Sequence, residues 1–126
     1  MSKSIVQEIG SQAETWALDY LKKQGLDLVV RNFHCHRGEI DLILKDKEDL
    51  VFVEVRYRHQ KNFGSGIETV DGAKQRKIIR SAEYYLYSQK IWDHPCRFDV
   101  IGISVDIKQR IEIVWEKNAF FGNYYI

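Results

Sequence analysis

The sequence predicts an α/β domain with a mixed sheet of about five strands flanked by two main helices. Apolar residues recur at helical spacing in two segments, and five short segments rich in β-branched and aromatic residues lie around them. The order is helix, three strands, helix, two strands. Short connections predict antiparallel pairing of the first three strands, and the helix after the third allows a parallel crossover to the fourth. With 126 residues, 44% of them hydrophobic, the chain is expected to form one domain over 1–126.

The first helix is predicted from Ile5 and ends before Gly25, and the second spans Ala73–Ser88. The strands are expected at Leu26–Phe33, Gly38–Leu44, Leu50–Tyr57, Arg97–Val105 and Arg110–Glu116, with a glycine-rich loop from Arg58 to Gly72. The third strand is apolar on both faces at its start, which is typical of the middle of a covered sheet.

Several classes of protein are disfavoured. No run of about 18 apolar residues is present, so no membrane span is expected. The first residues lack an apolar signal core, and Cys35 and Cys96 form no metal-binding motif, which predicts free thiols in a cytoplasmic protein. His34 and His36 could share a strand face, but no further ligands have suitable spacing for zinc.

Charge is distributed unevenly along the chain. The net charge is +1, yet residues 56–80 hold seven basic and two acidic residues. The basic residues are Arg56, Arg58, Lys61, Lys74, Arg76, Lys77 and Arg80. A basic segment beside an acidic cluster fits a phosphate-bearing ligand with a metal, and a solvated loop and helix face is the alternative.

Two carboxylates stand in apolar strand contexts. Asp41 lies between Ile40 and Leu42, and Glu54 lies between two valines. If the two strands pair, Asp41 and Glu54 can meet across the ladder. Such carboxylates are costly unless they are paired or bind a metal, and oxygen ligands favour Mg²⁺ or Mn²⁺. The alternative is a structural salt-bridge network with Arg56 and Arg58.

Glu14 and the aromatic residues leave alternatives open. Glu14 borders the apolar stripe of the first helix and could face the rim of the sheet, or it could be a solvated carboxylate. Trp16 is expected in the core. Tyr84, Tyr85 and Tyr87 are expected to pack the second helix with one exposed ring, and a base-stacking role is disfavoured. The aromatic C-terminal end, 120–126, could contact a partner or fold onto its own core.

The chain resembles the YraN family of uncharacterised bacterial proteins from Gly10 to Phe120. The matching pieces are Gly10-x3-Glu14-x2-Ala17-x2-Tyr20-Leu21, Arg31-Asn32-Phe33, Gly38-Glu39-Ile40-Asp41-Leu42-Ile43, Val51-Phe52-Val53-Glu54-Val55-Arg56-x-Arg58, Phe63-Gly64, Val70-x3-Lys74, Ala82-x2-Tyr85-Leu86, Arg97-Phe98-Asp99-Val100-Ile101 and Asn118-Ala119-Phe120. That family is similar to archaeal Holliday-junction resolvases and to the PD-(D/E)xK nucleases.

The resemblance implies a restriction-endonuclease-like core and roles for individual residues. Asp41 and Glu54 would bind metal with the Val55 carbonyl, and Glu14 would complete the site. Arg56 stands where the superfamily has Lys. Because guanidinium effectively cannot lose its proton, Arg56 could hold a phosphate oxygen but could not act as a base. Lys74 could substitute if it reaches the site.

The favoured expectation is therefore Mg²⁺- or Mn²⁺-dependent cleavage of DNA, with a structured or branched substrate implied by the resolvase likeness alone. Asp41, Glu54, Arg56 and Glu14 would be catalytic, and the basic residues from Arg58 to Arg80 would track the backbone. The alternative is a nuclease-fold module that binds nucleic acid or a protein partner without cutting. Self-association as a homodimer is also implied by the resolvase likeness.

Overall fold

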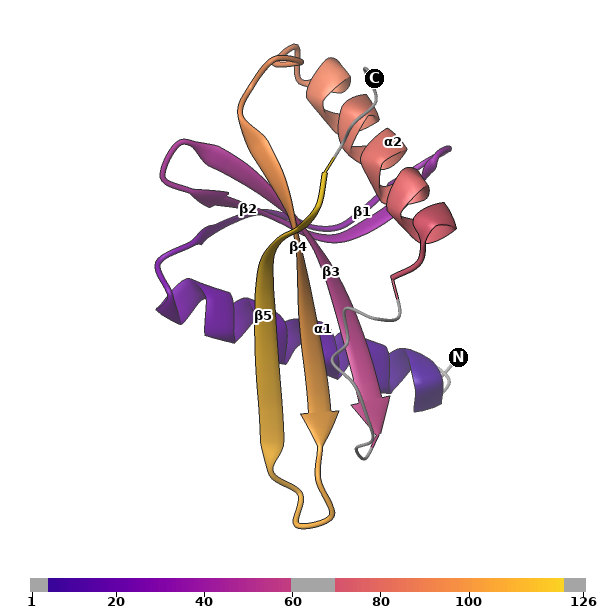
Figure 1. Ribbon diagram of the computed structural model, residues 1–126, viewed down its shortest axis with the longest axis vertical. Coiled ribbons are helices and arrows are strands. Elements are labelled where there is room, and N and C mark those ends of the chain that lie inside the picture. The colour runs from indigo at the N-terminus through magenta and orange to yellow at the C-terminus, as the bar shows by residue number, and fades with distance from the viewer. Residues whose placement is uncertain (1–4, 60–69, 122–126) are drawn as a thin grey trace.

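The chain folds into a five-stranded sheet with one helix before it and one between its third and fourth strands (Figure 1). The structure is a computed structural model that describes residues 5–59 and 70–121. Its elements are α1 (Ile5–Lys23), β1 (Asp27–Cys35), β2 (Gly38–Asp46), β3 (Asp49–His59), α2 (Gly72–Ser88), β4 (Cys96–Val105) and β5 (Ile111–Phe120). The predicted fold class and element order are confirmed.

The sheet follows chain order, β1-β2-β3-β4-β5. Antiparallel pairs join β1 to β2, β2 to β3 and β4 to β5, whereas β3 and β4 are parallel. This confirms the antiparallel meander and the crossover through α2. A parallel connection needs such a crossover because the chain must return to the end of the sheet at which β3 begins before β4 can run in the same direction.

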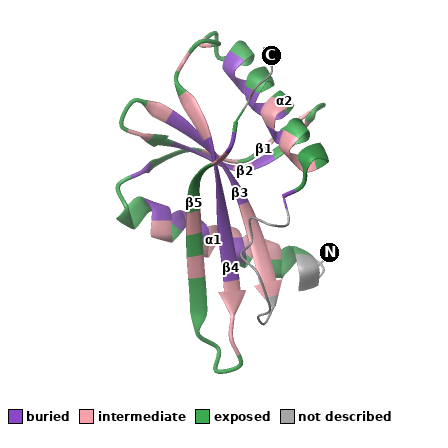
Figure 2. Ribbon diagram, in the orientation of Figure 1, coloured by how far each residue is buried: buried purple, intermediate pink, exposed green. Residues whose placement is uncertain are grey.

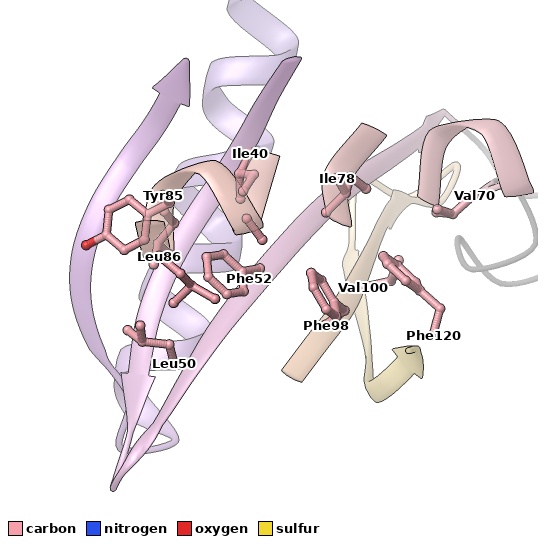
Figure 3. Packing of buried hydrophobic residues seen from close by; sticks show 12 residues of the cluster. Ile40, Leu50, Phe52, Val70, Ile78, Tyr85, Leu86, Phe98, Val100 and Phe120 are labelled. Atoms are coloured by element: carbon pink, nitrogen blue, oxygen red, sulfur yellow. The ribbon is translucent and has the colours of Figure 1, made fainter. Parts of the chain in front are cut away.

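The two faces of the sheet pack separate hydrophobic cores. On one face, strand residues including Leu42, Val53 and Ile101 pack with the apolar stripe of α1. On the other, Phe52 and Val100 pack with Ile78 and Ala82 of α2 (Figure 3). Figure 2 shows the buried residues concentrated where the strands cross between the helices. Because both faces are covered, the start of β3 can be apolar at successive residues.

The last strand is longer than the sequence predicts. It continues past Glu116 to Phe120, although Asn118 has the positive φ of 52° and the β4–β5 register shifts beside Asp99. The Asn118 backbone N–H donates to Asp99 Oδ1 at 3.1 Å. The carboxylate therefore bridges the irregularity and lets the ladder resume at Phe120, which is buried in the core.

Asp99 is fully buried and is the centre of a polar network. Arg97 Nε donates to its two oxygens at 3.1 and 3.2 Å, and Trp115 Nε1 donates to Oδ2 at 2.9 Å. Arg97 Nη1 also donates to Asp46 at 2.9 Å, which ties β4 to the end of β2. Burial lowers and these carboxylates raise the pKa of Arg97, with a net rise above its ordinary value. A buried carboxylate with this many donors is a structural element of the sheet.

Other differences from the sequence expectations are local. The strands β1, β2 and β3 each extend two residues beyond their predicted ends, and for β1 and β2 the reason is the short hairpin turn that follows. Tyr85 is buried, but both Tyr84 and Tyr87 are exposed, so the expectation of one exposed tyrosine ring was wrong. Trp16 packs against the core at partial burial, as expected. Phe121 is exposed, and 122–126 lie outside the described residues. No helix in the described part of the chain is long and apolar enough to cross a membrane.

We expect Asp99→Ala to lower the free energy of unfolding by about 3 kcal/mol, because Arg97 loses its buried partner and the N–H groups of Trp115 and Asn118 lose their acceptor. Urea unfolding followed by circular dichroism measures this. The control, Asp19→Ala on the exposed side of α1, should stay within about 0.5 kcal/mol of the wild type. Equal midpoints for the two variants would contradict a structural role for Asp99.

Candidate functional site

An acidic site forms where the β2–β3 ladder ends. Backbone pairing runs from Asp46 and Asp49 to Leu42 and Val53 and then stops. At the next step, the Val55 backbone N–H donates to Asp41 Oδ2 at 2.8 Å. A side chain thus takes the place of a partner-strand carbonyl. This contact fixes Asp41 against β3 just where the two strands separate.

Glu54 is the second acid of the site and is nearly buried, with 6% of its side chain exposed. It lies two residues after Phe52 on β3, so both side chains point to the face of the sheet that α2 covers. Its Oε2 accepts a hydrogen bond from Arg56 Nη1 at 3.2 Å and lies 3.7 Å from Lys74 Nζ. The site therefore places one buried carboxylate between a guanidinium of its own strand and an ammonium of α2.

The N-cap of α2 positions Lys74. Asp71 caps the helix by accepting from the Lys74 backbone N–H at 2.9 Å. This contact starts the helix at Gly72 and places Lys74 in its first turn, with its side chain about one-third exposed. The possibility that Lys74 reaches the acidic site, which the sequence left open, is confirmed by the ion pair with Glu54.

Electrostatics couple Asp41 to both helices. Burial and then the charge of Glu54 raise the pKa of Asp41 from 3.8 to about 8, and Glu14 adds to the rise. The hydrogen bond from Val55 and the charge of Lys74 oppose it. Asp41 is thus neutral over much of the neutral pH range unless a cation joins it.

Glu14 lies near the site but is held by another partner. Its Oε1 is 3.5 Å from Arg31 Nε, and Arg31 Nη2 also donates to Ser11 O at 2.9 Å and to Thr15 Oγ1 at 3.0 Å. Arg31 therefore fastens α1 to β1 and holds Glu14 at the rim of the sheet. The expected border position of Glu14 fits this placement.

The donor chemistry of the site fits a hard divalent cation. Mg²⁺ prefers oxygen ligands and usually keeps several waters, so one or two carboxylates can hold it. Asp41 and Glu54 supply two carboxylates, and the carbonyl of Val55 follows directly in sequence. Among residues 5–59 and 70–121, no three His, Cys, Asp or Glu side chains form a ready metal cluster. The metal role of Asp41, Glu54, Glu14 and Val55 stays a prediction.

The other candidate residues have varied positions. Arg76, Lys77 and Arg80 are exposed on α2, Arg58 is half-buried at the end of β3, and Lys61 lies outside the described residues. Within the part that the structure describes, Arg58 forms no ion pair, so the network expected as the alternative includes Arg56 but not Arg58. His34 faces Glu39 at 3.2 Å on the exposed surface.

Sequence reasoning assigned no role to Arg31. Asn32, next to it, has the positive φ of 58°, and the β1–β2 register shifts between Leu28 and Val30. Asn tolerates this backbone conformation better than most residues. Asn32 is therefore a sequence signal for irregular backbone beside Arg31, but it does not indicate the contacts of Arg31 with α1.

The chain is similar to a set of bacterial proteins along most of its length. Residues 13–103 match the sequence model described as "Uncharacterised protein family UPF0102". A UPF0102 protein of Legionella pneumophila subsp. pneumophila is 49% identical over 92% of this chain and 97% of its own length. Those of Alcanivorax borkumensis and Pseudomonas syringae pv. syringae are 47% and 43% identical, covering 89% and 95% of this chain and 90% and 98% of their own lengths.

We expect the Asp41→Asn variant to be more stable than the wild type at alkaline pH. A pKa raised from 3.8 to about 8 means that the folded protein keeps a proton that the unfolded chain has released. This group therefore makes stability fall as pH rises between those values. The variant has no such proton and keeps an oxygen for the Val55 N–H. Its melting temperature should exceed that of the wild type by at least about 4 °C at pH 9, and the gain should shrink towards pH 4.

Asp106→Asn is a control of opposite sign, because hydrogen bonds from Arg110 lower the pKa of Asp106. That variant should be less stable than the wild type at neutral pH and should match it only below the lowered pKa. A stability difference for Asp41→Asn that does not change with pH would contradict the raised pKa of Asp41.

Proposed function

This chain belongs to the UPF0102 family, the YraN family of the sequence analysis, and we propose that it is a metal-dependent endonuclease that hydrolyses phosphodiester bonds in DNA. The observation that carries the proposal is the meeting of Asp41 and Glu54 at the end of the β2–β3 ladder, with two cationic side chains on Glu54. Paired carboxylates with adjacent cations suit a phosphate group and a divalent ion together.

Asp41, Glu54 and the Val55 carbonyl would hold Mg²⁺ or Mn²⁺. When bound, the ion would supply Lewis acidity, polarising a phosphoryl oxygen and making water a better nucleophile. The hydrogen bond from Val55 occupies Oδ2 of Asp41 and leaves Oδ1 as the oxygen for a ligand. Glu14 would contribute its charge from the rim, since Arg31 holds its carboxylate.

Hydrolysis would form a bond from a water oxygen to phosphorus and break the bond to a bridging oxygen. The water loses a proton, and the leaving oxygen takes one up. Arg56 would hold a non-bridging oxygen, because guanidinium offers paired donors and stays charged. Lys74, as the free amine, would accept the proton that the water loses, and solvent would supply the proton that the leaving oxygen takes up; Lys can serve here because, unlike guanidinium, an ammonium can release its proton when its surroundings favour the amine. Arg56 and Lys74, which both contact Glu54, would thus share the two roles expected of the superfamily's single Lys: Arg56 would bind the phosphate and Lys74 would transfer the proton.

Phosphate contacts would come from the basic residues on α2 and at the end of β3. Arg76, Lys77 and Arg80 are exposed on the helix that carries Lys74. Such contacts position a nucleic acid backbone without specifying its sequence. The proposed substrate is therefore DNA bound through its backbone, with cleavage at the site of Asp41 and Glu54.

One observation favours a second candidate, a nuclease-fold module that binds nucleic acid or a protein partner and does not cut. Glu54 is paired with Arg56 and Lys74, and Asp41 accepts from Val55, so both acids have partners without a metal. The two candidates differ in whether a divalent ion displaces these cations from Glu54.

We expect the pure protein to nick DNA in Mg²⁺ or Mn²⁺ and to lose at least about a hundredfold in rate in Asp41→Asn and in Glu54→Gln, since each removes a metal-binding charge. Cleavage of labelled linear and branched duplexes measures this, with Glu112→Gln as an exposed control on β5, away from the proposed DNA path. Full cleavage by both variants would indicate a contaminating nuclease and reject the proposal. Metal-independent DNA binding without cleavage would favour the module.

We expect Lys74→Ala to lower the cleavage rate by about a hundredfold or more, in the range of proton-transfer catalysis. Lys74→Arg should not restore the rate, because it keeps the charge but not the labile proton. The matched control is Lys22→Ala, an exposed lysine in the last turn of α1, away from the proposed DNA path. Wild-type rates in Lys74→Ala, or full rescue by Lys74→Arg, would exclude the proton-transfer role.

A further inference from the structure

A hollow of about 450 Å³ lies beside the C-terminal half of α2, separate from the acidic site. Its walls come from the β1–β2 turn, from α2 and from the turn that follows α2. We call it the aromatic hollow, and its lining includes Arg37, Arg80, Glu83, Tyr84, Tyr87 and Trp92. Its volume is in the range of sites that hold a small ligand group.

The aromatic rings of this hollow are exposed to an unusual degree. Tyr87 is 70% exposed and Trp92 60%, and their ring centroids are 5.6 Å apart at an angle of 39°. Tyr84 is held edge-on by His36 at 5.1 Å. None of the three rings belongs to the core of the protein. Rings that are held in place but left uncovered offer a preformed surface for stacking.

Two exposed arginines flank these rings. Within residues 5–59 and 70–121, Arg37 and Arg80 form no ion pair. Glu83 also lines the hollow, which leaves one excess positive charge. Arginines beside stacked rings suit a ligand with both a planar ring and a phosphate. The Glu83 carboxylate can accept a hydrogen bond from an exocyclic amine.

A second hollow lies along α2 beside Lys74, the residue that contacts Glu54. It measures about 340 Å³ and is lined by Lys74 and Lys77 of α2 and by Gly38 and Glu39 of β2. Gly38 directly follows Arg37, and Lys77 lies one helical turn before Arg80, so the two hollows adjoin. Ten residues separate Lys74 from Tyr84, which corresponds to about 15 Å along the helix axis. Cations on α2 therefore mark a path from Glu54 to the exposed rings.

We propose that the aromatic hollow binds an unpaired nucleotide of a DNA strand whose backbone continues along Lys77 to the acidic site. Tyr87 and Trp92 stack on the base, and Arg37 and Arg80 hold its phosphates. The proposal rests on the proposed function and narrows its substrate to DNA with an unpaired strand beside the cleaved bond. It differs from the sequence-based expectation, in which Tyr84, Tyr85 and Tyr87 pack the helix with one exposed ring and base stacking is disfavoured.

Binding of short labelled duplexes in EDTA tests the hollow without cleavage. The duplexes are blunt, or carry a thymidine overhang, or carry the same overhang with abasic sites that keep the phosphates but lack the bases. We expect the wild type to bind the overhang about tenfold more tightly than the blunt end, and to lose most of this preference with abasic sites, since stacking on aromatic rings depends on the base.

Variants assign the preference to the rings. Trp92→Ala and Tyr87→Ala should bind the normal and the abasic overhang alike, whereas Trp92→Phe should keep the preference for the normal overhang because it keeps a ring. Ile107→Ala, which removes an 82% exposed side chain outside the hollow, is the matched control and should bind as the wild type does. Arg37→Ala should weaken binding to both overhangs, because they share the phosphates.

Equal binding of the three duplexes by the wild type, or an unchanged preference in Trp92→Ala and Tyr87→Ala, would overturn the proposal. Its failure is distinguishable from failure of the proposed function. An overhang preference without metal-dependent cleavage supports the hollow and rejects the nuclease. Cleavage without an overhang preference supports the nuclease and rejects the hollow.

Discussion

The hydrogen bond from the Val55 backbone to Asp41 is the contact on which the site depends, because it lies where the β2–β3 ladder stops. A carboxylate in that place gives the last N–H of the pairing a partner after the strands have begun to separate. It also holds Asp41 close enough to Glu54 for the second charge to raise the pKa of the first. The Asp41 carboxylate thus accepts the hydrogen bond that the Val55 N–H requires and at the same time forms part of the acidic site.

Side chains of β3 and α2 offset the electrostatic cost of this arrangement. The two buried carboxylates repel each other. Ion pairs with Arg56 and Lys74 stabilise the charge of Glu54, and Asp41 keeps a proton below its raised pKa. A divalent ion would exchange for that proton, so metal binding would release it and grow stronger towards alkaline pH. By contrast, buried Asp99 accepts four hydrogen bonds from three donor groups and stabilises the sheet alone.

Much of the fold could be predicted from periodicity, because both helices and all five strands carry apolar patterns of sufficient length. The path of β5 past Asn118 could not, since it depends on a side chain of another strand, Asp99. The shared position of Asp41 and Glu54 could be predicted from strand alternation. The approach of Lys74 could not, because it requires the crossover angle of α2, which local sequence does not determine. The exposure of Tyr84 and Tyr87 likewise depends on which part of α2 the sheet leaves uncovered.

A crystal structure of the protein soaked in Mn²⁺ above pH 8, where Asp41 is ionised, tests the central claim most directly. We expect anomalous density about 2.1 Å from oxygens of both Asp41 and Glu54, with Lys74 moved away from Glu54. An empty site at saturating Mn²⁺, with Glu54 still bound to Arg56 and Lys74, would contradict it and leave the two acids a structural salt-bridge cluster.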